Sequence, residues 1–169
     1  KSSKSKTNLD KRSYHVIKSN PQVRFARWEV YGKSLVYRST KNLFGFSKLT
    51  TNGKWVKEKW VTGLNAPKGL RSHGDTLWVS DIDRIVGIRI STGKIIHRID
   101  IPGAKFLNDL ACAPDGTVYV ADMIDSKIHA WKNGKLSVFA EGKEIESPNG
   151  LLVFQNKLHV AAWGYTTDF

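Results

Sequence analysis

The sequence has one cysteine, few acidic residues and no long apolar run. Because Cys112 is the single cysteine, a disulfide within the chain is excluded. Cys112 lies in the apolar run 110–113 with no histidine close by in sequence, so we expect a buried structural thiol, and the redox compartment stays open. No run of 18 apolar residues occurs, which argues against a membrane-spanning helix.

The signatures of several common enzyme classes are also missing. The chain has no phosphate-binding glycine loop of the Walker or dinucleotide type and no G-x-S-x-G serine elbow. No segment follows the 3.6-residue period of a helical solenoid. The five histidines show no spacing typical of metal ligands: His15, His73, His97, His129 and His159.

Acidic residues are scarce relative to basic ones. The chain carries 27 Lys and Arg against 15 Asp and Glu, a net charge of +12 with a pI near 9.9. Such a balance raises the hypothesis of nucleic-acid or anionic-membrane binding. The positive residues are spread over turns and strand edges and form no stripe interleaved with aromatic residues. We therefore interpret them as a soluble basic surface and do not expect a nucleic-acid partner.

A pattern that returns at a nearly constant interval organises the chain. The central copy is FLNDLACAPDGTVYVAD at 106–122, preceded by PKGLRSHGDTLWVSD at 67–81 and followed by SPNGLLVFQNKLHVAA at 147–162. Equivalent positions such as Asp81 and Asp122 are 41 residues apart. A period of this length is typical of a repeat protein.

Each period contains four short strands joined by tight turns. Asn133-Gly134, between two apolar runs, is a strong hairpin signal. Four antiparallel strands repeated about every 40 residues make one blade of a β-propeller, so the predicted fold class is all-β. The four strands expected in the central copy are 110–113, 118–121, 127–131 and 136–139.

The predicted blades do not fill a ring. Residues 1–22 form a polar basic tail that we expect to be disordered, apart from a strand that residues 14–17 are able to add. Residues 23–169 hold about three and a half blades, whereas a propeller needs at least four to close. We therefore expect the missing blades to come from a longer chain or a partner subunit. The expected blades are 23–66, 67–106, 107–147 and an incomplete 148–169.

The six tryptophans fall mostly on predicted strand positions. We expect them to pack between blades, because large rings bury well between sheets. Trp78, Tyr119 and His159 are equivalent in the repeat, which predicts a structural position for all three.

The residues that open the innermost strand of each blade meet at one mouth of the channel. In this chain they are Lys68, Asn108 and Asn149, followed by Gly69, Asp109 and Gly150 respectively. Two carboxamides beside a carboxylate would form an oxygen site suited to Ca²⁺ or another hard divalent ion. The alternative is that these Asn and Asp side chains end turns and bond their own backbone.

Four segments resemble the senescence-marker-protein/gluconolactonase family of six-bladed propellers: GLNAPKGL at 63–70, GAKFLNDLACAPDGTVYVAD at 103–122, SPNGLLV at 147–153 and AAWG at 161–164. The resemblance covers about 100 residues. It implies a divalent-metal-dependent lactone or ester hydrolase acting on a small molecule, in which the ion polarises the carbonyl and activates water.

Residue by residue, the resemblance implies Asn108 and Asn149 as metal ligands. Ca²⁺ is the expected ion, with Zn²⁺ and Mn²⁺ as alternatives. Lys68 and Asp109 are expected to contact the substrate, and Asp109 is also a candidate catalytic residue.

The sequence departs from the family at two points. The glutamate ligand of the family falls near Ala26 or Arg27, and its catalytic aspartate falls after Phe169. We therefore expect this chain to be incomplete and inactive alone. The alternative function is a non-catalytic propeller that binds a ligand or partner on its channel face. The start at Lys1 and the resemblance together predict a periplasmic or secreted protein, with a cytoplasmic one left open.

Overall fold

The computed structural model describes residues 28–31, 34–37, 45–50, 52 and 54–164. The predictions for the tail, for a strand at 14–17 and for Ala26 and Arg27 lie outside the described residues. In the described ranges, no helix is long and apolar enough to cross a membrane.

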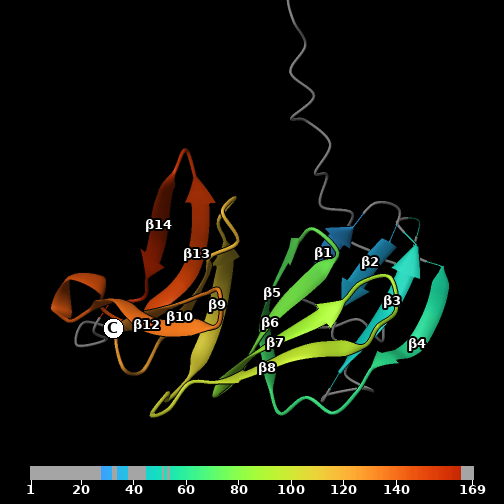
Figure 1. The fold of residues 1–169 in the computed structure, drawn as a ribbon, viewed down its shortest axis with the longest axis horizontal. Helices are drawn as coiled ribbons and strands as arrows, with labels where there is room; N and C mark the ends of the chain where they lie inside the picture. The colour runs from blue at the N-terminus through green and yellow to red at the C-terminus, as the bar shows by residue number, and fades with distance from the viewer. Residues whose placement is uncertain (1–27, 32–33, 38–44, 51, 53, 165–169) are drawn as a thin grey trace, which may run out of the picture.

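The described residues fold into consecutive antiparallel sheets (Figure 1). The first sheet consists of β1 Trp28–Tyr31, β2 Ser34–Tyr37, β3 Phe46–Thr50 and β4 Trp55–Val61. The second consists of β5 Pro67–His73, β6 Thr76–Asp81, β7 Arg84–Arg89 and β8 Ile95–Asp100. The third consists of β9 Leu107–Cys112, β10 Val118–Asp122, β11 Lys127–Lys132 and β12 Lys135–Glu141. After a short 3₁₀ helix, η1 Lys143–Ile145, the fourth holds β13 Pro148–Phe154 and β14 Lys157–Ala162.

Strand order within each sheet follows the sequence, so each sheet is a meander. The first strands of neighbouring sheets lie against one another: β1 against β5, β5 against β9 and β9 against β13. Three four-stranded sheets and one two-stranded sheet, arranged side by side through their first strands, form a partial β-propeller. The all-β propeller prediction is confirmed.

Two of the connections between strands are tight turns with positive φ at both central residues. Asn133 and Gly134, between β11 and β12, have φ of 50° and 79°. Gln155 and Asn156, between β13 and β14, have φ of 49° and 57°. Positive φ at both central positions is typical of the type I′ turn, whose twist matches that of the flanking strands. The predicted turn at Asn133-Gly134 is confirmed.

Apolar side chains fill the spaces between neighbouring sheets. Phe46 and Trp60 of the first sheet pack against Leu77 and Ile88 of the second. Ala111 and Ile128 of the third sheet pack against Leu151 of the fourth. The core is therefore a series of layers between blades, as expected for a propeller.

The aromatic residues are not all used as expected. Trp60 and Trp78 are buried and Trp131 packs between the second and third sheets, as predicted. Trp55 and Trp163 are instead exposed. Trp55 begins β4, the last strand of the first sheet, and Trp163 directly follows β14. Cys112 is partly buried and packs against the cluster between the second and third sheets.

Three rings in mutual contact lie at the interface between the second and third sheets. Trp78 of β6 stacks on His97 of β8 at a centroid distance of 5.3 Å, and Trp131 of β11 lies 5.1 Å from Trp78. Gly87 lies beneath this group, where a Cβ atom would come within 2.9 Å of His97 and 3.0 Å of Trp78. Glycine therefore allows the rings to pack directly on the backbone of β7.

Candidate functional site

The predicted ring positions are structurally equivalent. Lys68, Asn108 and Asn149 are each the second residue of the first strand of a sheet. Because β5, β9 and β13 lie side by side, their opening residues gather at one end of the channel wall. A binding role for these three residues stays a prediction.

The two asparagines share a partner that the sequence did not suggest. The side-chain N–H groups of Asn108 and Asn149 both donate to Sδ of Met123, at 3.7 Å and 3.8 Å. Met123 directly follows β10, in the turn before β11. Since both amides orient their nitrogen toward one sulfur atom, they lie close together, with Asn108 buried and Asn149 half-buried.

Lys68 contributes a positive charge on the second-sheet side. Its Nζ atom lies over the Phe106 ring, 5.0 Å from the ring centroid. This cation–π contact holds the ammonium near the start of β9, one residue before Leu107. The mouth therefore combines a cation with two carboxamides.

Asp109 does not lie exposed beside the asparagines. It is buried, and its Oδ2 accepts a hydrogen bond from Arg71 at 3.1 Å and another from the Leu151 backbone N–H at 3.0 Å. Arg71 reaches further and donates to the Leu151 carbonyl at 3.3 Å. The carboxylate of Asp109 thus joins the first strands of three sheets, β5, β9 and β13.

Gly69 permits this arrangement. A Cβ atom at Gly69 would lie 2.7 Å from Oδ1 of Asp109 and 2.9 Å from the Asn108 carbonyl oxygen. Because a residue with a side chain would not fit there, β5 and β9 approach closely only with glycine at this position. Ser80 further joins the two strands, since its hydroxyl accepts from the Gly69 N–H and donates to the Asn108 carbonyl.

Two other buried aspartates hold the segments that directly precede the first strands β5 and β9. Asp122 accepts hydrogen bonds from the backbone N–H groups of Lys105 and Phe106, at 2.7 Å and 2.9 Å. Asp81 does the same one sheet earlier, for Asn65 and Ala66. These aspartates stabilise the segment that leads into the mouth and are not available as ligands.

The fourth sheet lacks this carboxylate. Ala162 pairs with Pro148 as Asp81 pairs with Pro67 and Asp122 with Leu107, so Ala162 occupies the equivalent position. The segment before β13 is held instead by backbone bonds, with the Trp163 N–H donating to the Ser147 carbonyl at 2.9 Å.

The two asparagine side chains alone do not complete the ligand set of a Ca²⁺ ion. Ca²⁺ takes six to eight oxygen ligands, usually including carboxylates. Asn108 and Asn149 supply two amide groups, while Asp109 is held by Arg71 and Leu151. Among the residues that the structure describes, no group of three or more His, Cys, Asp or Glu is placed to hold a metal ion. The predicted metal site therefore stays a prediction, for which further ligands would be needed.

His129 is the buried histidine of the third sheet. It lies on β11 with 7% of its surface exposed, and in the described part of the chain its Nε2 atom has no hydrogen-bond partner. Burial lowers the pKa of His129 below its usual value, a shift partly opposed by the negative charge of Asp122. The equivalent residue of β7 is Val86, because Val86 pairs with Val79 as His129 pairs with Val120.

Solved structures with a similar fold are propellers. Virginiamycin B lyase from Staphylococcus aureus, a catalytically inactive variant with quinupristin, matches with a TM-score of 0.60 and 16% identity over 73% of this chain. A structure of a nidogen/laminin complex matches with a TM-score of 0.64 and 15% identity over 78% of this chain. At such identities the likeness concerns the fold alone.

The chain spans about half or less of these structures: 43% of the lyase and 52% of the nidogen/laminin structure. No family model and no curated protein matches the sequence. The propeller architecture is therefore shared with known proteins, while the membership of the gluconolactonase family implied by the sequence stays a prediction.

Proposed function

We propose that the mouth formed by Lys68, Asn108 and Asn149 binds a small polyhydroxylated carboxylate, and that residues 1–169 act as a non-catalytic propeller segment. The observation that carries this proposal is the convergence of both asparagine side chains on Met123. Carboxamides both donate and accept hydrogen bonds, so a pair of them suits a ligand rich in hydroxyl groups.

The charge of the mouth favours an anionic ligand. Lys68 carries a positive charge there, and the carboxylate of its neighbour Asp109 is already compensated by Arg71. A ligand carboxylate would therefore meet the ammonium group of Lys68. The same engagement of Asp109 argues against its use as a general base, because a base needs a lone pair directed at the substrate.

Calorimetric titration with two matched polyols tests the proposal. D-gluconate carries a carboxylate and sorbitol is its neutral analogue of equal chain length. We expect gluconate to bind more tightly, with at least a tenfold weaker affinity in Asn149→Ala and in Lys68→Met. Lys94→Met removes an exposed lysine at a distant turn and serves as the control. Equal binding of the two polyols, or no loss in the variants, would contradict the proposal.

The second candidate is the metal-dependent lactone or ester hydrolase implied by the sequence resemblance. One observation favours it: Asn108 and Asn149, the two ligands that the resemblance implies, lie together at the mouth. Titration of Ca²⁺, Zn²⁺ and Mn²⁺ into the chain and into Asn149→Ala tests it. Binding that is lost in the variant would support a metal half-site. Absence of binding to the folded chain would favour the non-catalytic function.

A further inference from the structure

Met123 lies at the channel mouth beside the two asparagines. Its sulfur atom accepts hydrogen bonds from the side-chain amides of Asn108 and Asn149, at 3.7 Å and 3.8 Å. Its backbone is also fixed, because the Met123 N–H donates to the Phe106 carbonyl at 3.0 Å. The sulfur atom therefore has a set position beside the starts of β9 and β13.

The contacts of Met123 are not those of an ordinary core methionine. A methionine usually fills a gap in an apolar core or contacts an aromatic ring. In the described part of the chain, Met123 belongs to none of the three apolar clusters between the sheets. A thioether sulfur is only a weak acceptor, yet this one receives two N–H donors. A stronger acceptor at this place would satisfy both donors better.

Oxidation of the sulfur supplies such an acceptor. A peroxide converts a methionine thioether into a sulfoxide. With hydrogen peroxide, a sulfur lone pair attacks one oxygen, the S–O bond forms as the O–O bond breaks, and the proton of the transferred oxygen passes to the departing hydroxide, which leaves as water. Sulfur loses two electrons and the peroxide gains them. Met123 is half-buried and is the single methionine of the chain, so part of its surface is accessible and no second methionine competes for the reaction.

The sulfoxide would hold the two amides more strongly than the thioether does. The new oxygen takes one of the sulfur lone pairs and carries a partial negative charge, so an amide that donated to sulfur donates to oxygen instead. An N–H···O bond is about 2.9 Å long. The N···S distances of 3.7 Å and 3.8 Å are longer, so an oxygen on this side of the sulfur comes within hydrogen-bond reach of both nitrogen atoms.

We propose that Met123 is an oxidation site that controls the channel mouth, with a peroxide as the oxidant. In the thioether form the amides exchange their weak bonds to sulfur for bonds to a ligand. In the sulfoxide form the oxygen retains both amides, and its partial negative charge opposes the carboxylate of a ligand. The effect on ligand binding rests on the proposed function of the mouth, whereas the oxidation and the change at the amides do not.

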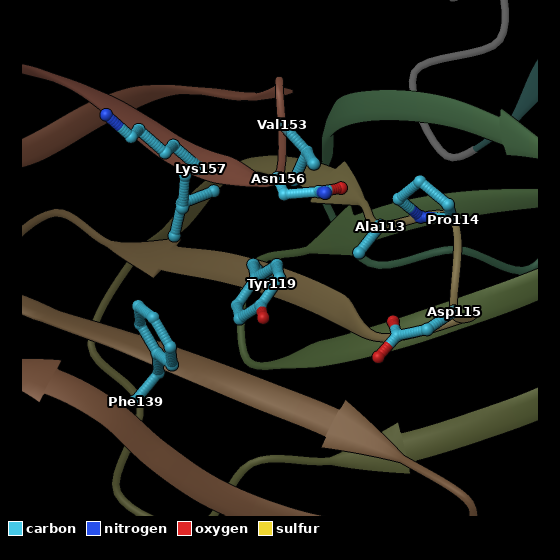
Figure 2. Close-up of a pocket in the computed structure, with 9 residues that line it drawn as sticks. Ala113, Pro114, Asp115, Tyr119, Phe139, Val153, Asn156 and Lys157 are labelled. Carbon is cyan, nitrogen blue, oxygen red and sulfur yellow. The ribbon is translucent and has the colours of Figure 1, made fainter.

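The first test needs no ligand. The chain is treated with hydrogen peroxide, and peptide mapping by mass spectrometry locates the added oxygen. In nuclear magnetic resonance spectra, the side-chain N–H resonances of Asn108 and Asn149 should move downfield, because their new bonds are to oxygen. Asn156 is the internal reference: it lines an open pocket together with Tyr119 and Phe139, beyond the opposite end of β13 (Figure 2), and its resonance should not move. Failure to form the sulfoxide in the folded chain, unfolding on oxidation, or unchanged resonances of both asparagines would overturn the proposal.

Titration with gluconate then tests the control of binding. Peroxide should weaken gluconate binding at least fivefold in the unaltered chain and leave Met123→Leu unaffected, because leucine has no sulfur to oxidise. Both proteins contain Cys112, so the comparison also accounts for oxidation of the thiol. Met123→Gln, which places an amide oxygen at the end of a side chain of similar length, should bind weakly without peroxide. Methionine sulfoxide reductase should restore binding to the oxidised chain.

The outcomes distinguish this proposal from the proposed function. If the untreated chain does not bind gluconate, the proposed function fails, while the amide resonances still decide whether oxidation acts on the mouth. If the untreated and oxidised chains bind gluconate equally well, the control by Met123 is overturned. An equal loss of binding in Met123→Leu would assign the effect to Cys112 and would overturn it as well.

Discussion

The interface between the second and third sheets can be compared with the interface between the third and fourth sheets. Each contains an aromatic residue at the same position of a second strand. Trp78 and Tyr119 occupy equivalent positions, and each contacts a ring from the fourth strand of its own sheet: His97 for Trp78 and Phe139 for Tyr119. The first interface receives Trp131 from the next sheet, whereas the second has no such ring in the described chain. Trp78 is consequently buried, at 6% exposure, whereas its equivalent Tyr119 is only half-buried.

The difference shows that burial in this fold is decided by the neighbouring blade. Trp78 and Tyr119 are both aromatic and lie at the same position of their second strands, yet in the described chain only Trp78 is covered by a ring of the next sheet. His159, the third member of the equivalent set, is exposed because no further sheet of the described chain faces it. A repeat therefore specifies the position of a ring, and the next repeat specifies whether that ring is buried.

Removing the closing ring should have the largest effect. We expect Trp131→Ala to lower the free energy of unfolding by about 3 kcal/mol, because it leaves a cavity over Trp78 and His97. Phe139→Ala removes the ring that contacts Tyr119 at the open interface and should cost about 1 kcal/mol or less, since this ring is largely exposed already. Urea denaturation measures both. Equal losses would show that the two interfaces are energetically alike.

Two equivalent glycines at the mouth, Gly69 and Gly150, allow a comparison of how closely the backbones of neighbouring first strands approach each other. Gly69→Ala should destabilise the chain by about 2 kcal/mol, because the new Cβ would overlap Asp109 and separate β5 from β9. Gly150, equivalent to Gly69 two sheets later, has its nearest obstacle at 3.4 Å, the Cβ of Ala161. Gly150→Ala should therefore change stability by about 0.5 kcal/mol or less. A Gly150→Ala loss as large as that of Gly69→Ala, in thermal or urea unfolding, would contradict this account.

His129 makes the closed interface sensitive to pH. Because burial lowers its pKa in the folded chain, the unfolded chain binds a proton more readily. The free energy of unfolding therefore has its full contribution from neutral His129 above the unfolded pKa of about 6.5, and it declines as the pH falls below that value. The charged groups around His129 are Asp122 of β10, Lys127 of β11, Asp125 of the turn between them and Glu141 of β12.

We expect His129→Val, which copies Val86 of the second sheet, to flatten the dependence of stability on pH below about 6.5. Urea unfolding of both proteins at several pH values gives the difference, in which the contributions of the other histidines cancel. A variant that keeps the full dependence would assign it to groups other than His129.

The smallest effect is expected at the surface beside the open pocket. Lys132 Nζ lies 2.5 Å from Oδ2 of Asp115, and this ion pair holds the pKa of Asp115 well below its usual range. Lys132→Met should return that pKa toward its usual range without a measurable change in stability, because both side chains are about half exposed. Nuclear magnetic resonance titration of the Asp115 carboxyl follows the shift. An unchanged pKa would mean that Thr117, the other hydrogen-bonding neighbour, dominates.

The period of the sequence predicted the fold because propeller blades repeat their turns. Asn133-Gly134 and the apolar runs of the third sheet were sufficient to place four strands, and the structure confirms them. The first strand was predicted at 110–113 but extends over Leu107–Cys112. Asn108 and Asp109 disfavour a strand by propensity, and bonds from Arg71 and Leu151, distant in sequence, hold them extended.

The candidate site was predictable in position but not in chemistry. The 40-residue spacing gives Lys68, Asn108 and Asn149 the same position in the first strands of three neighbouring sheets. The contact of Met123 with both asparagines could not be predicted, because no pattern in the sequence distinguishes Met123 from other apolar residues in turns. The hydrogen bonds of Asp109 could not be predicted either, because its partners Arg71 and Leu151 belong to other sheets and come close to it only in the folded chain.

The hydrogen bonds of Arg71 reach beyond adjacent repeats. In arrays in which each repeat contacts only its neighbours, stability is close to a sum of single-repeat and pairwise terms, and the array can unfold from its ends. Arg71 of the second sheet bonds both Asp109 of the third and the Leu151 carbonyl of the fourth. This next-nearest-neighbour link couples three sheets, so the two-stranded fourth sheet cannot detach without also leaving the Arg71 guanidinium short of an acceptor. The channel wall thereby gains cooperativity that a chain of pairwise contacts would not supply.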